Sequence, residues 1–489
     1  MLLSQLLERV ELLSPCSPAE VAGITGDSRK VSTGDVFVCM PGARVDGHAY
    51  ARAAAAAGAA AIVAERDTGL PNQVLVRDSR AAYSLMCAAF FGYPADRLPI
   101  IGVTGTNGKT TTCFVLKEIL EHAGFRTGLI GTVWNMIGSK RLKSSLTTPD
   151  AFELQSLFAE MLREGCAYCV MEVSSQALAQ GRVAGVAFRC AAFTNLSEDH
   201  LDYHHNIENY LAAKQILFTQ TTSAVVNLDD DYAPEILAAC KSQATTFSTQ
   251  RDEADFTAKS ICATQRSVEY VLVGKNLIGR VHFPVPGLFS VYNSMCASVC
   301  ALELGVGLDT VIQAVSASAG VPGRMEVLKT DTPFTVIIDY AHTPDGLDKV
   351  LGELRSSVRG KLIAVFGCGG DRDKKKRPIM GKIAFRRSDV MIVTSDNPRT
   401  EDPGSIIADI VAGIDVNADK PQVIIEADRT RAIAAALRMA GPGDAVVLAG
   451  KGHETYQILN SGTIDYDERE KVASILEAMK RGEANDGET

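Results

Sequence analysis

Hydrophobic and polar positions follow two alternating patterns along most of the chain. Short, nearly continuous apolar runs, such as 100–104, are followed by stretches in which apolar residues recur at helical spacing, as at Phe114, Val115, Ile119 and Leu120. The first pattern is typical of a strand in a parallel sheet, and the second is typical of a helix packed on such a sheet. We therefore predict an α/β protein whose sheets are largely parallel.

Breaks in this pattern predict three domains, a number that also fits 489 residues at roughly 100 to 200 residues a domain. The first covers 1–98 and contains an alanine-rich helix followed by a buried strand. The second covers 99–322 and opens with the strand 100–104. The third covers 323–489 and repeats the alternation of strands and helices, which predicts a Rossmann-like C-terminal domain.

Some segments depart from the main pattern. Residues 1–11 predict an amphipathic helix with charges inside its apolar run, which does not fit a signal peptide. Residues 251–286 alternate apolar and polar positions and predict an antiparallel insertion. The polar residues 481–489 predict a frayed end. The strands expected in the third domain are 336–339, 362–366, 390–394, 423–426 and 445–449.

Composition and charge narrow the class of protein. Hydrophobic residues make up 46% and charged residues 22% of the chain, as in a globular protein with large cores. The 58 acidic and 49 basic residues give a net charge of −9, which argues against a nucleic-acid-binding protein with a broad basic surface. Because no window of about 18 residues is uniformly apolar, we expect no membrane span.

The twelve cysteines lack the spacing of a disulfide scaffold. Cys166 and Cys169 form a lone C-x-x-C pair, for which buried thiols are a simpler interpretation than zinc or redox chemistry. Reduced thiols and the absence of an export signal predict a cytoplasmic protein.

The strongest local signal for chemistry is the turn 105–110, Gly-Thr-Asn-Gly-Lys-Thr, between a strand and an amphipathic helix. Glycines let backbone N–H groups approach phosphate oxygens, and a helix N-terminus adds partial positive charge. Lys109 is placed to bridge the β- and γ-phosphates, and the Thr110 hydroxyl to bind Mg²⁺. Val103 stands where the usual motif has its first glycine, so the loop is a variant. A turn with an incidental lysine is the alternative, but the coincidence of all parts predicts a central P-loop ATPase domain.

Acidic residues and histidines follow the central strands. Glu172 ends an apolar run, and in a parallel sheet that end faces the ligand crevice, which makes it a candidate Mg²⁺ ligand. A solvated carboxylate is the alternative. The segment 194–205 holds three histidines and three carboxylates but lacks the H-E-x-x-H pattern of a zinc site, and each histidine alone fits a surface or core role. Lys214 lies among apolar neighbours, where a snorkelling lysine is the simple interpretation.

Taken in order, these segments resemble the Mur ligase family, the ATP-dependent amino-acid ligases of peptidoglycan synthesis. The matching segments span nearly the whole chain, and they are 105–110, 172–175, 199–202, Lys214, Asn293, Arg324 and 339–342. The resemblance implies a ligase that uses ATP and Mg²⁺ to activate a carboxylate as an acyl phosphate, and then couples an amino acid to it.

The resemblance also implies roles for individual residues. Lys109, His200 and Lys214 would be catalytic, with Lys214 in a carbamylated form that turns a cation into an anion suited to a metal site. The implied metal ligands are Thr110, Glu172, His200 and Lys214. The implied nucleotide contacts are Gly105, Thr106, Asn107, Gly108, Lys109, Thr110, Thr111, Asn293, Arg324 and Asp339. Closure of the third domain would bring Arg324 to the ATP.

One segment of the third domain points to the amino-acid substrate. Residues 396–399, Asp-Asn-Pro-Arg, look like the motif of family members that add meso-2,6-diaminopimelate. Arg399 can bind the distal carboxylate of that amino acid in bidentate geometry, a group that L-lysine lacks. A plain β-turn is the alternative for an Asn-Pro pair. The basic run 374–377 predicts a solvated face. The implied contacts are Arg372, Asp396, Asn397, Arg399, Gly450 and Glu454.

The first domain is implied to hold the UDP-sugar of a second substrate, UDP-N-acetylmuramoyl-L-alanyl-D-glutamate. The implied uridine contact is Ser28, and the implied contacts of the muramoyl-peptide, which lie in the second domain, are Thr147, Thr148, Ser174, Gln180 and Arg182. An Asp-Ser turn is nearly as good an interpretation at Ser28, and the family's sugar-contacting loop is poorly matched at 43–45. We expect a monomer.

Three rival interpretations stay open. A folylpolyglutamate synthase or cyanophycin synthetase of the same superfamily is disfavoured by Ser28 and by 396–399. A lysine-adding homologue would gain nothing from Arg399. A non-catalytic nucleotide-binding regulator has little reason to retain a two-metal site.

Overall fold

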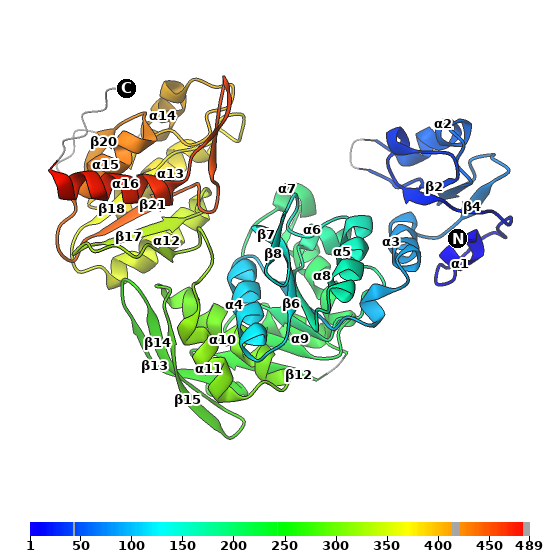
Figure 1. The fold of residues 1–489 in the computed structure, drawn as a ribbon, viewed down its shortest axis with the longest axis horizontal. Coiled ribbons are helices and arrows are strands. Elements are labelled where there is room, and N and C mark those ends of the chain that lie inside the picture. Colours follow the sequence, from blue (N-terminus) through cyan, green and yellow to red (C-terminus); the bar gives the residue numbers. More distant parts are fainter. Residues whose placement is uncertain (43–44, 242, 413, 415–420, 483–489) are drawn as a thin grey trace. The chain divides into compact units, whose positions relative to one another are not determined.

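A computed structural model of the chain describes residues 1–42, 45–241, 243–412, 414 and 421–482. The chain folds into two compact units (Figure 1). Unit 1 comprises Met1–Thr257 and Met295–Val311, and unit 2 comprises Ala258–Ser294 and Ile312–Thr489. The chain passes between the units three times, within strand β13 (Phe256–Ala263) and within the helices α10 (Leu288–Glu303) and α11 (Leu308–Ala317).

Unit 1 begins with a small parallel sheet in the order β1-β2-β3-β4. Its strands are β1 (Gly23–Thr25), β2 (Asp35–Val38), β3 (Ala61–Ala64) and β4 (Gln73–Leu75). Apolar side chains of α1 (Leu3–Leu6) and α3 (Ser79–Phe90) pack on one face, and the small side chains of α2 (Ala51–Ala56) pack on the other. Short 3-10 helices are η1 (Ser28–Lys30), η2 (Gly47–Tyr50) and η3 (Pro94–Asp96).

The predicted N-terminal helix over 1–11 is wrong in length, because α1 covers only Leu3–Leu6. Leu12 instead forms a β-bridge with Val76, and the Leu13 N–H donates to the Leu75 carbonyl at 2.8 Å. Pairing with the chain beyond β4 thus satisfies backbone groups that a longer helix would have used.

The main sheet of unit 1 has the order β12-β11-β10-β5-β9-β6-β7-β8. Its strands are β5 (Ile100–Thr104), β6 (Thr127–Ile130), β7 (Trp134–Ile137), β8 (Lys140–Lys143), β9 (Tyr168–Glu172), β10 (Cys190–Phe193), β11 (Ala224–Asn227) and β12 (Ala244–Ser248). The central strands are parallel, with Val103 beside Glu172 and Thr104 beside Phe193. The segments that follow β5, β9 and β10 therefore leave one edge of the sheet side by side.

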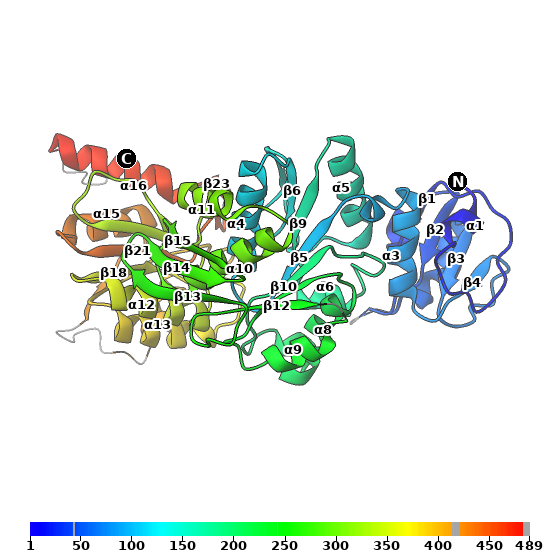
Figure 2. The same ribbon diagram turned by 90° about the horizontal axis from the view of Figure 1, so that it is seen from below.

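Helices cover both faces of this sheet, with α4 on one face and α5 and α8 on the other (Figure 2). The helices are α4 (Lys109–His122), α5 (Ala151–Arg163), α6 (Ser175–Ala179), α7 (Leu201–His204), α8 (Ile207–Thr219) and α9 (Ala233–Ala239). This layering explains why the central strands read as continuous apolar runs.

The predicted antiparallel insertion is confirmed. It consists of β13 (Phe256–Ala263), β14 (Val268–Gly274) and β15 (Leu277–Phe283), and β14 pairs with β15 in antiparallel register from Val268–Phe283 to Gly274–Leu277.

The sheet of unit 2 has the order β16-β17-β21-β18-β19-β20 and is parallel except for β16. All five strands predicted for the third domain are confirmed within one residue at each end. They are β17 (Thr335–Asp339), β18 (Leu362–Phe366), β19 (Val390–Val393), β20 (Gln422–Ile425) and β21 (Ala445–Ala449). The remaining strands are β16 (Glu326–Val327), β22 (Tyr456–Leu459) and β23 (Gly462–Asp465).

Helices sandwich this second sheet, with α15 and α16 on one face and α12 and α13 on the other (Figure 2). They are α12 (Pro344–Ser357), α13 (Lys376–Arg387), α14 (Pro403–Val411), α15 (Arg429–Met439) and α16 (Glu468–Arg481). The strand ends Asp339, Phe366 and Ala449 are neighbours in register, so the segments after them meet at one edge. The predicted frayed end lies outside the described residues from position 483 onward.

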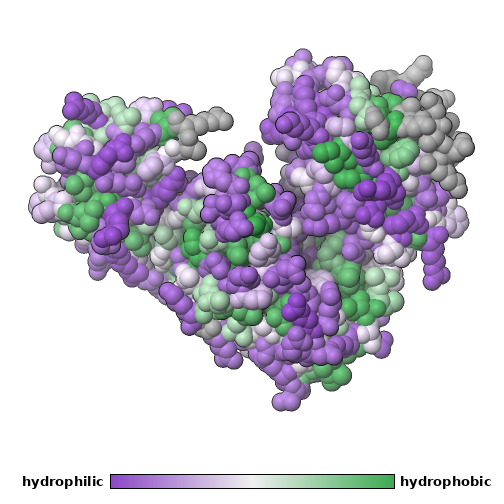
Figure 3. All heavy atoms as spheres, turned by 180° about the vertical axis from the view of Figure 1, so that it is seen from behind, coloured by the Kyte–Doolittle hydropathy of each residue, from purple (hydrophilic) through white to green (hydrophobic). Residues whose placement is uncertain are grey.

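The surface and the thiols agree with the expectations from composition. On the face shown in Figure 3, hydrophilic residues predominate and apolar ones occur in scattered groups. Among the described helices, none has the length and apolar character needed to cross a bilayer. All twelve cysteines are free thiols, and Cys166 and Cys169 are buried, as predicted.

Candidate active site

The predicted phosphate loop leaves β5 and enters α4. Gly105 has a φ of 150°, and a Cβ at this position would collide with the Thr194 hydroxyl. Gly108 caps α4 with a φ of 86°, in the left-handed region. Both positions therefore require glycine because of their positive φ, and Gly105 requires it also because Thr194 lies so close.

The loop is held by the segment that follows β10. The Thr194 hydroxyl donates to the Asn107 carbonyl at 2.7 Å, and the Asn107 N–H donates to the Asn195 side-chain oxygen at 3.0 Å. The ammonium group of Lys109 donates to the carbonyls of Gly105 and Thr106 at 2.8 and 2.9 Å. A braced turn with a lysine folded over it is the arrangement that phosphate binding requires.

Glu172 lies at the carboxyl end of β9 and is 1% exposed. Its carboxylate accepts hydrogen bonds from the Thr110 hydroxyl at 2.9 Å, the Thr132 N–H at 2.7 Å and the Thr132 hydroxyl at 3.2 Å. The alternative of a solvated carboxylate is therefore wrong. Thr132 was not predicted, because a backbone N–H at a strand end leaves no mark in sequence.

Lys214 is 1% exposed, so it is not a snorkelling lysine. Its ammonium lies 4.3 Å from the centroid of the Tyr210 ring. Burial, and then the positive charge of Lys109, lower the pKa of Lys214 well below its usual value. The surroundings of Lys214 therefore disfavour its protonated form.

His200 lies on the segment before α7 and has a φ of 54°. Its ring is half exposed and lies 3.6 Å from the Asp199 carboxylate. Within the described part of the chain, no three His, Cys, Asp or Glu side chains are grouped as a metal site. The structure thus brings Thr110 to Glu172 but does not gather Glu172 and His200 into such a group.

Five residues predicted for the UDP-linked substrate lie in one hydrogen-bonded network. The Thr148 hydroxyl donates to the Glu172 carbonyl at 2.8 Å and accepts from the Ser174 N–H at 3.0 Å. Arg182 donates to the Thr148 carbonyl at 2.8 Å and to the Gln180 side chain at 2.6 Å. The Thr147 hydroxyl lies 3.0 Å from that of Thr132, which links the network to the Glu172 carboxylate.

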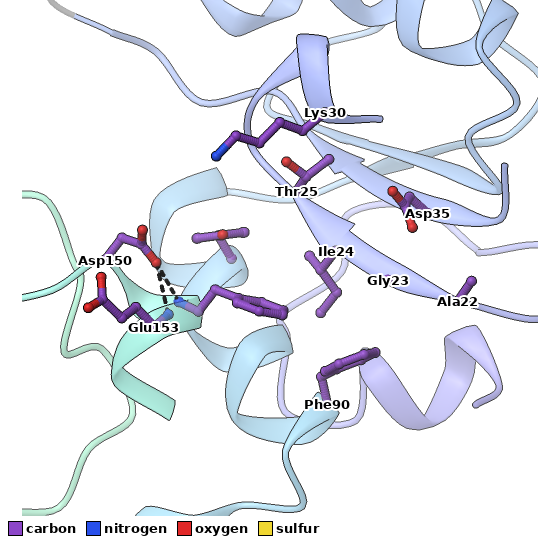
Figure 4. A pocket seen from close by; sticks show the side chains of 11 residues that line it. Ala22, Gly23, Ile24, Thr25, Lys30, Asp35, Phe90, Asp150 and Glu153 are labelled. Atoms are coloured by element: carbon purple, nitrogen blue, oxygen red, sulfur yellow. Dashed lines mark hydrogen bonds between the residues drawn. The ribbon is translucent and has the colours of Figure 1, made fainter. Parts of the chain in front are cut away.

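Ser28 lies apart from this network, at the start of η1 beside an Asp27–Arg29 ion pair of 2.8 Å. A cavity of about 420 Å³ lies along β1 and is also lined by Lys30 of η1 and by Asp150 and Glu153 at the start of α5 (Figure 4). Lys30 projects from the η1 side toward these carboxylates in the same view. Of the predicted sugar-contacting loop 43–45, residues 43 and 44 lie outside the described part of the chain.

In unit 2, two predicted nucleotide contacts lie together. The buried Asp339 carboxylate accepts from the backbone N–H groups of Met325 and Ala341 at 2.7 and 2.8 Å. Burial raises the pKa of Asp339, and the charge of Arg324 opposes that shift. The Arg324 guanidinium lies 4.7 Å from the centroid of the Tyr340 ring. The third contact, Asn293, is buried in α10.

The predicted amino-acid contacts of unit 2 converge at the ends of β19 and β21. The Asn397 side chain donates to Glu454 at 2.8 Å. The ammonium of Lys451, which was not predicted, lies 3.5 Å from Asp396, 3.2 Å from Asn397 and 3.3 Å from Glu454. Lys451 stands inside the Gly450–Glu454 segment, so its place in the motif was a signal for this role.

Arg399 and Arg372 border the same edge of the sheet. Arg399 has a φ of 53°, and its guanidinium donates to the Gly370 carbonyl at 2.7 Å. Asp396 pairs with Lys451 rather than with Arg399. Arg372 is exposed on the loop after β18. Gly450, with a φ of 113°, lies close to the Asp396 carboxylate.

The predicted solvated face over 374–377 is wrong at Arg377, whose side chain is 0% exposed. Arg377 forms ion pairs with Glu401 at 2.8 Å and with Asp409 at 2.9 Å. Glu401 also accepts from the Asp371 N–H at 2.6 Å. The first turn of α13 directs Arg377 inward, where two carboxylates compensate its charge.

Comparison with known proteins gives three matches to family models. Residues 20–84 match the Mur ligase family catalytic domain, residues 103–301 the Mur ligase middle domain, and residues 323–452 the Mur ligase glutamate ligase domain. Together these ranges cover more than half of the chain.

Individual relatives extend over nearly the full length. A protein of Clostridium perfringens named UDP-N-acetylmuramoyl-L-alanyl-D-glutamate--2,6-diaminopimelate ligase is 44% identical over 98% of this chain and 100% of its own. A solved structure with that enzyme name has a TM-score of 0.74 at 34% identity, covering 98% of this chain and 99% of its own. A MurF ligase from Thermotoga maritima, solved in complex with ADP, shares the fold at 20% identity and a TM-score of 0.59, with 95% and 99% of the two chains covered.

Proposed function

Because the chain belongs to the Mur ligase family, we propose that it adds meso-2,6-diaminopimelate to UDP-N-acetylmuramoyl-L-alanyl-D-glutamate at the expense of ATP. This reaction extends a peptidoglycan precursor. The observation that carries the amino-acid assignment is the convergence of Asn397, Arg399 and Glu454 at one sheet edge of unit 2. These side chains supply a guanidinium and a carboxylate for the two charges of the distal end of diaminopimelate.

The nucleotide site is assigned to the loop 105–111 of unit 1, with Asn293, Arg324 and Asp339 as further contacts. Lys109 would exchange its loop carbonyls for phosphate oxygens. The buried oxygens of Thr110 and Glu172 are hard ligands within hydrogen-bond distance of each other, and so they fit Mg²⁺. When bound, the ion offsets charge on the transferring phosphoryl group. Glu172 with His200 is proposed to hold a second ion, and Lys214 is proposed as a further metal ligand in its carbamylated form.

The assignment of Lys214 fits its environment. Burial and the charge of Lys109 lower the pKa of Lys214 and so favour the neutral amine, which is the form that adds CO₂ to give a carbamate. A carbamate would place a negative charge beside Lys109, where the unmodified lysine suffers repulsion from a like charge.

The UDP-linked substrate is assigned to Ser28 and to the network of Thr147, Thr148, Ser174, Gln180 and Arg182. That network adjoins the Glu172 carboxylate through Thr132 and Thr148. The cavity along β1 is lined by Lys30, two residues after Ser28, and by Asp150, two residues after Thr148, which supports a ligand that extends between these two segments. The substrate carboxylate would attack the γ-phosphate, and the amine would then attack the acyl phosphate to form the amide.

The coupled dependence of ADP release tests this function. Release should require both UDP-N-acetylmuramoyl-L-alanyl-D-glutamate and meso-diaminopimelate, whereas release without either would favour a nucleotide-binding regulator.

The Arg399 variants test the amino-acid assignment. Arg399→Ala should lower kcat/KM for diaminopimelate by about a hundredfold or more, and Arg399→Lys should restore little because an ammonium cannot bind a carboxylate in bidentate geometry. Equal use of L-lysine by the wild type would favour the lysine-adding homologue.

The wider setting is also proposed. We place the protein in the cytoplasm, a location that the free thiols support. We also propose that it is a monomer. The domain boundaries at 98/99 and 322/323 stay predictions.

A further inference from the structure

Lys451 is a fully buried cation at the sheet edge of unit 2. Its side chain is 0% exposed, and its ammonium lies 3.3 Å from Glu454 and 3.5 Å from Asp396. It also donates to the Asn397 side-chain oxygen at 3.2 Å. A buried ammonium is costly unless it is paired, so its retention among two carboxylates calls for an account beyond packing.

The charges of this cluster sum to a simple number. Asp396 and Glu454 contribute two negative charges and Lys451 one positive charge, which leaves the cluster with one uncompensated negative charge. Asn397 bridges Lys451 and Glu454 without adding charge. The cluster therefore has room for a single further ammonium.

Arg399 brings a second positive group to the same neighbourhood. The pKa of Tyr456 reflects these nearby charges. Burial raises this pKa, the negative charges of Glu454 and Asp396 raise it further, and the positive charge of Arg399 lowers it. With Arg399 included, the four charged side chains are neutral in sum. A zwitterionic amino-acid end keeps that balance, whereas a lone ammonium leaves Arg399 unmatched.

We propose that Lys451 is a specificity-determining residue that sets the charge of the amino-acid pocket, so that a zwitterionic end is accepted and a lone ammonium is rejected. This inference rests on the proposed function. Without Lys451 the pocket carries one extra negative charge, which attracts the distal ammonium of L-lysine. The same charge gains little with diaminopimelate, because its distal carboxylate is repelled as its ammonium is attracted.

The test is kcat/KM for meso-diaminopimelate and for L-lysine with the full chain, in the wild type and in Lys451→Met. The ratio of the two should fall at least about tenfold, through a rise for L-lysine. Adding Glu454→Gln to Lys451→Met should remove that rise, because it deletes the extra charge. If Lys451→Met does not fold, Lys451→Gln carries the same expectation, since its amide is neutral and can hydrogen-bond.

A matched control is Lys117→Met, which removes another buried lysine, paired with Glu121 at 2.6 Å in α4. Its ratio should equal that of the wild type. Equal loss for both amino acids in the Lys451 variants would overturn the inference and assign Lys451 a purely structural role. A wild type that does not prefer diaminopimelate would instead overturn the proposed function.

Discussion

The hydroxyl group of Thr110 donates a 2.9 Å hydrogen bond to the buried carboxylate of Glu172. Thr110 lies in the first turn of α4, the helix after the phosphate loop, and Glu172 is the last residue of the neighbouring strand β9. The bond therefore ties the end of one central strand to the loop that leaves the next.

Glu172→Gln should keep the fold and lose the charge. The glutamine oxygen can still accept from the Thr132 N–H, and its amide N–H can donate to the Thr110 hydroxyl in place of the bond that the carboxylate accepts, so the midpoint of thermal unfolding should change little. A bound Mg²⁺ would lose its anionic ligand. We therefore expect kcat to fall by about a hundredfold and the Mg²⁺ concentration that gives half-maximal activity to rise. Mg²⁺ titration of ADP release measures both. Glu164→Gln, at an exposed ion pair with Arg126, is the control, and a wild-type Mg²⁺ curve for Glu172→Gln would remove Glu172 from the metal site.

Lys214 should carry a CO₂ adduct in the active protein. Burial and the nearby charge of Lys109 lower the pKa of Lys214, which favours the neutral amine that reacts with CO₂. Native mass spectrometry should show one added CO₂, lost on acidification, and Lys214→Met should lower kcat by about a hundredfold. The buried Lys117 is the internal reference and should be unmodified. An active protein with an unmodified Lys214 would contradict this prediction.

Arg377→Met should lower the free energy of unfolding of unit 2, because it removes the buried partner of Glu401 and leaves that carboxylate with only Lys374, which is largely exposed. Glu401 also holds the Asp371 N–H, so the loop bearing Arg372 should loosen and KM for the amino acid should rise. Arg387→Met is matched to it, since this arginine lies on the same helix and is paired with Asp348 at 2.9 Å but is partly exposed. Denaturant unfolding and amino-acid KM are measured together. Equal effects of the two variants would refute the claim.

Acid should weaken unit 2 through His453. Burial, and then the charge of Arg324, lower the pKa of His453 to about 4 from 6.5. Above pH 6.5 the ring is neutral in both the folded and unfolded states, so its contribution is constant. As the pH falls toward 4, only the unfolded chain takes up the proton and stability drops. Urea unfolding at several pH values should show a shallower loss in His453→Gln than in the wild type, and His122→Gln, at an exposed position, should follow the wild type.

Sequence patterns predicted the phosphate loop and the strands of unit 2 well because those features are local. A buried strand, two glycines and a Lys-Thr pair specify a turn whatever else surrounds them. Glu172 was located for the same reason, as a charge that ends an apolar run. Its partner Thr132 was not, since the contact joins residues 40 apart and uses a backbone N–H.

Two basic residues show where sequence reasoning stopped short. Arg377 was grouped with its basic neighbours, although Arg377, Met380, Gly381 and Ala384 repeat at helical spacing and form the buried face of α13. That periodicity was visible and predicts an inward arginine. Lys451 was passed over because its three partners come together only when the segments after β19 and β21 meet.

The ammonium of Lys109 already has two acceptors in its own loop, the carbonyls of Gly105 and Thr106. A phosphate that binds this lysine must compete with these carbonyls. Phosphate binding therefore replaces existing hydrogen bonds of the Lys109 ammonium and does not simply add new ones. Affinity for the nucleotide then depends on the difference between the two sets, and a change that weakens the carbonyl contacts would tighten binding without touching the ligand.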